Sequence, residues 1–323
     1  MKKFYYLENG RSALNYALNN SNLTKDDEIL YPEYSCDVLF QYSRKNQYNY
    51  SFYKTKNNFF LSLNLLKKKI TSKTKVIIII NFFGIKQNMK ILYKLCKQKK
   101  ILLFVDDCHT YYDLNKSIDY DCDVKFFSPA KIFNQLSSGG VLQINNKSIK
   151  LKNILKTKKN NINFIINLKI NLKNTQLYEK YKFLKNRPHF EDKNFFKSTY
   201  NVSELLLNKK NILIINKIDI KKENKSRIKN FKFWNLVCKK FELKPLLDIK
   251  DIKHGCPLYF PAMCKSYKHS IKMYDYGWNN KIEIVSWPSL HSIQRKNKKL
   301  INQWQKVIYF PMEKNYSNNK HLL

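Results

Sequence analysis

The chain has 323 residues, which is enough to bury a large core and to form one large domain with a smaller companion. Its formal net charge of +37 would ordinarily indicate a nucleic acid or an anionic membrane as partner. Lys, however, recurs with Asn and Ile throughout the chain instead of gathering in one cluster, so we expect no nucleic-acid partner and keep a basic nucleic-acid-binding protein as an alternative.

The cysteine pattern and the apolar runs exclude several further classes. The seven cysteines are odd in number and have no paired C-x-x-C spacing, so we expect reduced thiols in a cytoplasmic protein and no metal site. Glu8, Asn9 and Gly10 end the first apolar stretch before the core of a signal peptide could form. The longest apolar run, Val76–Ile80, is far shorter than the roughly 20 residues of a membrane span.

Short apolar runs alternate with helical patterns through the first half of the chain. In chain order we predict a helix at Ser12–Leu18, strands at Ile29–Tyr31 and Tyr50–Tyr53, a helix at Phe59–Lys68, a strand at Lys75–Ile80, a helix at Met89–Gln98, and strands at Ile101–Val105, Val124–Phe127 and Val141–Ile144. Continuous β-branched runs are typical of strands that are covered on both faces. The pattern therefore predicts an α/β domain with a mostly parallel sheet.

The second half of the chain has a different texture. Residues 146–229 are rich in Lys and Asn and are predicted to be helical where Leu and Ile recur. From about residue 230 we predict a smaller α+β domain, with a helix at Phe231–Lys240, a strand-like stretch "CPLYFPAMC" and a helix at Tyr267–Tyr276. The predicted division is therefore 1–229 for the large domain and 230–323 for the small one.

Polar residues follow the predicted strands where a parallel sheet would bind a ligand. Asp106 comes directly after "ILLFV", and Ser128 comes directly after "VKFF" and three residues before Lys131. Ligands of parallel sheets lie beyond the carboxyl ends of the strands, so both side chains should lie over the same edge. Arg11 and Ser12 stand at a helix start, where free N–H groups favour a phosphate.

Taken singly, these residues have ordinary explanations as a turn, a cap and a solvated lysine. Together they fit pyridoxal 5′-phosphate, which needs an amine to hold its aldehyde, a carboxylate to keep its pyridine nitrogen protonated, and donors for its phosphate. A free lysine has a pKa of about 10.4, so such a site must alter its amine to make it reactive.

The same residues resemble the DegT/StrS family of sugar aminotransferases, which are fold-type-I pyridoxal-phosphate enzymes. "GRSALNYAL" is similar to the family's phosphate-side helix start, and "IIIINFFGIKQ" followed by "ILLFVDDCHT" is similar to its H-x-x-G and D-x-x-H segments. "DVKFFSPAKIFNQLSSGGVL" resembles the segment that carries the cofactor lysine. The resemblance implies a large domain around a mostly parallel sheet and a small C-terminal α+β domain.

The resemblance also implies roles for three residues near the cofactor ring. Lys131 corresponds to the Schiff-base lysine, which also carries the proton in the transfer step. Asp106, and not Asp107, corresponds to the partner of the pyridine nitrogen. His109 would lie against the ring or its 3′-oxygen, and it would be the stacking group because Cys36 stands where many members have an aromatic residue.

Further residues would hold the phosphate or join two subunits. The resemblance implies that Ser128, Arg11 and Ser12 bind the phosphate, and that Asn201 reaches the neighbouring active site of a homodimer. The adjacent run Leu205–Leu207 is predicted to be part of the apolar interface that such a dimer needs.

The implied activity is the transfer of an amino group, with glutamate as the family's usual donor, to a nucleotide-linked keto-sugar for surface polysaccharide or amino-sugar biosynthesis. Lys131 stands where the dehydratase branch of the family has histidine, which favours a transaminase. The arginine that commonly follows the Asn201 position is missing, with Lys209 or Lys210 as possible substitutes. A member without catalysis, acting as a binding or regulatory subunit, therefore remains an alternative.

Overall fold

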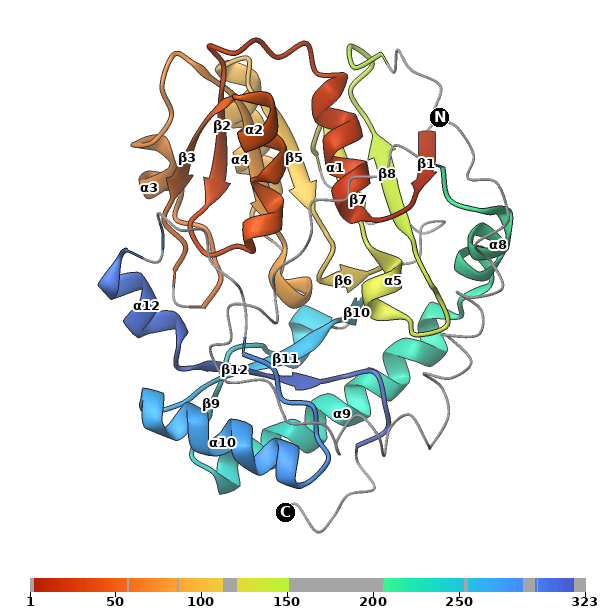
Figure 1. The fold of residues 1–323 in the computed structure, drawn as a ribbon, viewed down its shortest axis with the longest axis vertical. Helices are drawn as coiled ribbons and strands as arrows, with labels where there is room; N and C mark the ends of the chain where they lie inside the picture. Colours follow the sequence, from red (N-terminus) through yellow and green to blue (C-terminus); the bar gives the residue numbers. More distant parts are fainter. Residues whose placement is uncertain are drawn as a thin grey trace.

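The computed structural model of the chain describes residues 3–56, 58–85, 87–112, 121–150, 206–252, 255–286, 294 and 296–316. A seven-stranded sheet forms its larger part, with the strand order β1-β8-β7-β5-β4-β2-β3 (Figure 1). The strands are β1 (Lys3–Leu7), β2 (Glu28–Pro32), β3 (Asn49–Tyr53), β4 (Thr74–Ile80), β5 (Leu102–Asp106), β7 (Val124–Phe127) and β8 (Gly140–Ile144). The predicted α/β class with a mostly parallel central sheet is confirmed.

One strand of this sheet, β8, runs against the direction of the others. Neighbouring pairs from β3 to β7 are parallel, whereas β8 is antiparallel to both β7 and β1. Because β8 runs against both neighbours, β1 runs in the same direction as β7. The carboxyl ends of β1, β2, β3, β4, β5 and β7 therefore lie at one edge, which points down toward α5, β6 and β10 in Figure 1.

Alternate residues of the central strands enter two different cores, one on each face of the sheet. Ile78 and Ile80 pack with the apolar residues of α1 (Gly10–Asn19), while Ile77 and Ile79 pack with those of α4 (Met89–Gln98). Figure 1 shows α1 in front of the strands and α4 behind them. Burial on both faces explains why β4 is an uninterrupted run of β-branched residues.

Two elements differ from the sequence-based predictions. We predicted no strand at Lys3–Leu7, yet β1 forms the edge of the sheet beside β8. The predicted helix at Phe59–Lys68 was too long, because α3 comprises Leu63–Lys67 and Phe59 lies in a turn with φ 65°. The buried Phe59 ring explains the error, since its apolar character belongs to an aromatic core contact and not to a helix face.

The C-terminal part forms a second, three-stranded sheet with helices on it. Its strand order is β12-β11-β9, and the lower half of Figure 1 shows α9 and α10 beside it. The elements are α8 (Lys209–Lys217), α9 (Ile220–Lys240), β9 (Lys244–Pro245), β10 (Cys256–Pro257), β11 (Tyr259–Met263), α10 (Tyr267–Asn279), α12 (Lys298–Trp304) and β12 (Val307–Pro311). Residue 230 lies inside α9, so the division into 1–229 and 230–323 stays a prediction.

The two parts of the molecule also meet through a short antiparallel pair. β10 pairs with β6 (Thr110–Tyr111), which begins four residues after the end of β5. All seven cysteines are free thiols. Within the described residues, no helix is both long enough and apolar enough to cross a membrane.

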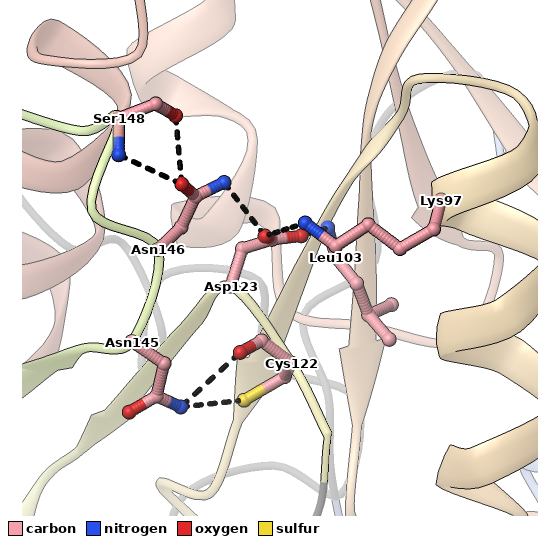
Figure 2. A network of polar contacts seen from close by, with 7 residues as sticks. All are labelled: Lys97, Leu103, Cys122, Asp123, Asn145, Asn146 and Ser148. Atoms are coloured by element: carbon pink, nitrogen blue, oxygen red, sulfur yellow. Dashed lines mark hydrogen bonds and ion pairs between the residues drawn. The ribbon is translucent and has the colours of Figure 1, made fainter.

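A buried carboxylate secures the edge of the large sheet that lies opposite the carboxyl ends. Asp123, which is fully buried, accepts hydrogen bonds from the backbone N–H of Leu103 (2.8 Å) and from Nδ2 of Asn146 (2.8 Å), and it pairs with Nζ of Lys97 (2.9 Å) (Figure 2). These partners come from β5, from the segment after β8 and from α4. One side chain therefore joins three elements that are distant in sequence.

We predict that Asp123→Ala lowers the free energy of unfolding by about 3 kcal/mol, because the substitution leaves buried donors without their acceptor. Urea unfolding followed by circular dichroism measures the loss. Lys97→Met is the matched control and should cost about 1 kcal/mol or less, because the Lys97 side chain is 49% exposed and its pair is screened by water. Equal losses for the two variants would contradict a central role for Asp123.

Candidate active site

The candidate site lies at the edge where the parallel strands end. β5 ends at Asp106, and β7 leads through Ser128 into the short helix α5 (Pro129–Ile132) that contains Lys131. β1 ends beside them and leads into α1. Gly10, the first residue of α1, lies so close that an added Cβ would stand 3.2 Å from the Cβ of Ser128 and 2.7 Å from Sγ of Cys108.

Asp106 is a buried carboxylate with a positive charge nearby. Its Oδ1 accepts a hydrogen bond from the backbone N–H of Cys108 at 2.8 Å. Burial raises the pKa of Asp106 above its ordinary value, and the charge of Lys131 and the N–H of Cys108 oppose that rise. A carboxylate in this setting would gain stability in its ionised form from a further cationic N–H donor.

Lys131 lies on the exposed side of the same edge. The backbone N–H of Lys131 donates to the carbonyl of Ser128 at 2.9 Å, which closes the turn that begins α5. The Lys131 side chain is exposed, yet its charge affects the pKa of Asp106, of Cys108 and of His109. The amine is therefore both near the buried carboxylate and accessible from solvent.

His109 is buried beside two aromatic rings. Its ring centroid lies 5.0 Å from that of Phe83 and 5.7 Å from that of Phe82. Burial lowers the pKa of His109 well below 6.5, and the charge of Lys131 lowers it further. The imidazole is therefore neutral near neutral pH and can pack against a planar ring without the cost of burying a charge.

The phosphate-side residues are only partly prepared for a ligand. Asn9 caps α1, because its Oδ1 accepts from the backbone N–H of Ser12 (2.9 Å) and from the Ser12 hydroxyl (3.2 Å). Ser12 would have to release Asn9 before its hydroxyl could donate to a phosphate. The buried Ser128 side chain makes no capping hydrogen bond to α5, and Arg11 is half-buried at the start of α1.

Asp107 has a different environment from its neighbour. It is fully buried, and its Oδ1 accepts a hydrogen bond from Nδ2 of Asn81 at 2.8 Å. Asn81 directly follows β4, so this bond ties the ends of β4 and β5 together. Asn81 was not among the residues predicted from the sequence, although its position directly after a strand is the same signal that identified Asp106.

The loop after Asn81 requires a glycine. Phe83 has φ 53° and Gly84 has φ 97°, and the second value lies where side chains are rarely tolerated. This turn places Phe82 and Phe83 beside His109. The segment "NFFG", which resembles the family's H-x-x-G segment, thus forms a turn that places two aromatic rings beside His109.

The structure brings six of the seven predicted site residues to one sheet edge, and their proposed roles remain predictions. These six are Arg11, Ser12, Asp106, His109, Ser128 and Lys131. Asn201 lies outside the described residues, as does Leu205. Leu207 was predicted to belong to a dimer interface, but it is buried in the chain's own core, where its N–H donates to the carbonyl of Tyr6 at 2.9 Å.

The residues present fit pyridoxal 5′-phosphate by the chemistry of their donor set. Asp106 is a buried carboxylate whose raised pKa calls for a cationic partner, and the accessible amine of Lys131 lies near it. Ser128 and the start of α1, with Gly10 directly against Ser128, stand where a phosphate could bind. The fit rests on residues from three separate segments.

The amino-acid sequence matches one protein family. Residues 4–158 match the model of the DegT/DnrJ/EryC1/StrS aminotransferase family. The enzyme class predicted from the sequence, an aminotransferase, is the class of this family. No curated protein sequence matches the chain.

Solved structures of aminotransferases share the fold. Helicobacter pylori PseC, an aminotransferase of pseudoaminic acid biosynthesis, is similar with a TM-score of 0.64 and 14% identity, covering 99% of this chain and 84% of that one. The putative sugar aminotransferase Spr1654 of Streptococcus pneumoniae, in its PLP form, has a TM-score of 0.67 and 13% identity, covering 98% and 84%.

A dehydratase shares the fold as well. The E. coli GDP-4-keto-6-deoxy-D-mannose-3-dehydratase with bound hydrated PLP has a TM-score of 0.60 and 14% identity, covering 99% of this chain and 86% of that one. Pyridoxal phosphate, the predicted cofactor, is thus named in two of these similar structures. Residues 4–158 thus resemble the DegT/DnrJ/EryC1/StrS aminotransferase family, and the chain shares the fold of these solved structures.

Proposed function

We propose that this chain is a pyridoxal-phosphate aminotransferase that transfers an amino group, with glutamate as donor, to a nucleotide-linked keto-sugar in polysaccharide or amino-sugar biosynthesis. The observation that carries the proposal is the placement of an accessible amine, Lys131, near a buried carboxylate, Asp106, at the carboxyl edge of the sheet. The sugar as substrate is supported by PseC and Spr1654, which share the fold and are named as an aminotransferase and a putative sugar aminotransferase.

Bound pyridoxal phosphate would supply an electron-withdrawing ring that stabilises negative charge on the adjacent carbon. Asp106 would hold a proton at the ring nitrogen, since its buried carboxylate prefers a cationic partner. His109, neutral because burial lowers its pKa, would pack against the ring and exclude water from one side. Ser128 and Arg11 would bind the phosphate.

Lys131 would perform two tasks in succession. Its Nζ would hold the cofactor covalently, and the same amine would carry the proton in the transfer step. Both tasks need a side chain that reaches the ring yet can swing away from it. The exposed position of Lys131 on a one-turn helix suits that requirement.

Lys131→Ala should abolish the covalent adduct that sodium borohydride forms between wild-type protein and pyridoxal phosphate. Peptide mass spectrometry should find the reduced cofactor on Lys131 in the wild type. Because the chain has 61 Lys and Arg residues, Lys147→Ala, at another exposed site, controls for unspecific reaction and should keep the adduct. An adduct that persists in Lys131→Ala, or that maps to another lysine, overturns the assignment.

The neighbouring carboxylates make a matched pair for testing the ring-nitrogen role. Asp106→Asn should lower kcat by about a hundredfold or more, because the amide cannot keep the ring nitrogen protonated. Asp107→Asn should lower kcat by less than about tenfold, since Asp107 ties two strand ends through Asn81 and has no role at the ring. Comparable activity of Asp106→Asn and wild type would refute the assignment.

The same Asp106→Asn substitution should raise the thermal unfolding midpoint of the cofactor-free protein near neutral pH. Burial raises the pKa of Asp106, so its ionised form is disfavoured in the folded state and its contribution to stability falls as the pH rises through that pKa. The advantage of the Asn variant should therefore shrink toward pH values below about 4, where the carboxyl is protonated in both states.

A shared active site in a homodimer follows from the predicted role of Asn201. Lys131→Ala and Asn201→Ala proteins should each be inactive, and a mixture should recover activity because a hybrid dimer contains one intact site. Mixed subunits with separate affinity tags establish that exchange has occurred. Absence of recovery after confirmed exchange argues against a shared site.

A further inference from the structure

We propose that Arg227 is a positioning residue that holds the Lys131 segment and the His109 segment in their places beneath the active site. The inference rests on the proposed function for its consequences in catalysis. Its structural basis is a set of buried hydrogen bonds from α9, which is distant in sequence from both segments.

One face of α9 carries three buried polar side chains at a spacing of three residues, Asn224, Arg227 and Asn230. Each donates to two backbone carbonyls. Asn224 bonds to Ile252 (2.8 Å) and Gly255, and Asn230 bonds to Met312 (3.0 Å) and Lys314. These two asparagines thus connect α9 to parts of the C-terminal region alone.

Arg227 differs because its two bonds diverge. Nη1 donates to the carbonyl of Pro257 at 2.8 Å, and Nη2 donates to the carbonyl of Ile132 at 2.7 Å. Ile132 is the residue after Lys131 and the last residue of α5. One guanidinium therefore reaches the helix that carries the proposed cofactor lysine.

The hydrogen bond from Arg227 to Pro257 connects α9 to the His109 segment. Pro257 pairs with Thr110 across the β6–β10 pair, and the N–H of Leu258 donates to the carbonyl of His109 at 2.9 Å. By holding Pro257 in β10, Arg227 supports β6, whose first residue, Thr110, follows His109. The two predicted ring-contacting segments are thus connected through a single side chain.

The chemistry of arginine suits this position. The side chain is 2% exposed, and no described carboxylate forms an ion pair with it. Two backbone carbonyls accept hydrogen bonds from the guanidinium, and the Phe133 ring lies 6.0 Å from its central carbon. The planar fork can donate along two directions at once, whereas lysine is a point charge that cannot span both carbonyls in the same way. Burying such a charge costs free energy, and the shorter amide of an asparagine, as at positions 224 and 230, could not reach both Pro257 and Ile132.

The experiment compares Arg227→Met with Asn230→Leu, which removes an equivalent two-carbonyl clamp from the same helix. In the cofactor-free proteins, amide hydrogen exchange read by mass spectrometry should quicken for residues 128–136 and 255–258 in Arg227→Met. In Asn230→Leu it should quicken for residues 307–316 instead. The comparison needs no cofactor, so it tests the positioning even if the proposed function fails.

In the cofactor-loaded enzymes, Arg227→Met should lower kcat by about tenfold or more while KM for the amino donor changes by less than about threefold. The pH at which the visible absorption of the bound cofactor titrates should also shift. Asn230→Leu should keep kcat within about twofold and leave the titration unchanged. Arg227→Lys, which keeps the charge but loses the fork, should recover part of the kcat.

Several outcomes would overturn the proposal. One is a wild-type kcat and a wild-type absorption titration in Arg227→Met. Another is an equal fall of kcat in Arg227→Met and Asn230→Leu, which would make the effect a general loss of stability. If Arg227→Met does not fold, Arg227→Lys is the test variant. A wild-type kcat and a wild-type absorption titration in Arg227→Lys would then contradict the positioning role. Absence of cofactor binding by wild type, with the exchange pattern as expected, would reject the proposed function and keep the positioning role.

Discussion

The antiparallel strand β8, set between β1 and β7, is the constraint on which the site depends. A strand that runs against both neighbours makes those neighbours parallel to each other, so β1 and β7 end at the same edge of the sheet. β1 delivers the start of α1 to that edge, and β7 delivers Ser128 and α5. The contact is close: a Cβ on Gly140, the first residue of β8, would stand 2.1 Å from the carbonyl oxygen of Asn9.

The adjacent residues Asp106, which ends β5, and Asp107 have different environments. Asp107 has a partner within the fold, the amide of Asn81, and thereby joins two strand ends. Asp106 bonds to the backbone of Cys108 and stands near the charge of Lys131, and burial still raises its pKa. A buried carboxyl with a raised pKa lowers folding stability near neutral pH, and groups of this kind are common at functional sites.

The buried polar side chains of this protein act mainly as connectors between distant segments. Asp123 joins β5, α4 and the segment after β8 at one edge of the sheet, and Arg227 joins α9 to α5 and β10 beyond the other. Buried polar groups cost free energy unless they are hydrogen-bonded, so each connector specifies one arrangement of the segments that it contacts. The site is thus supported from outside its own loops.

The sequence by itself determined the elements whose burial is uniform. The apolar runs at β2, β4, β5, β7 and β8 and the periodicity of α1 and α4 predicted those elements to within a few residues, because a strand buried on both faces must be continuously apolar. The order of polar residues after the strands also predicted Asp106, Ser128 and Lys131 as neighbours, since parallel strands share one carboxyl edge.

Tertiary structure decided the rest. β1 is a five-residue edge strand whose apolar residues alone do not distinguish it from a loop, and it exists because β8 offers it a partner. Phe59 looked like a helix residue and instead fills an aromatic core. Arg227 resembled any other cation in a basic chain, because its partner Ile132 lies 95 residues away, and the hydrogen bond runs from the Arg227 side chain to a backbone carbonyl that no local pattern identifies.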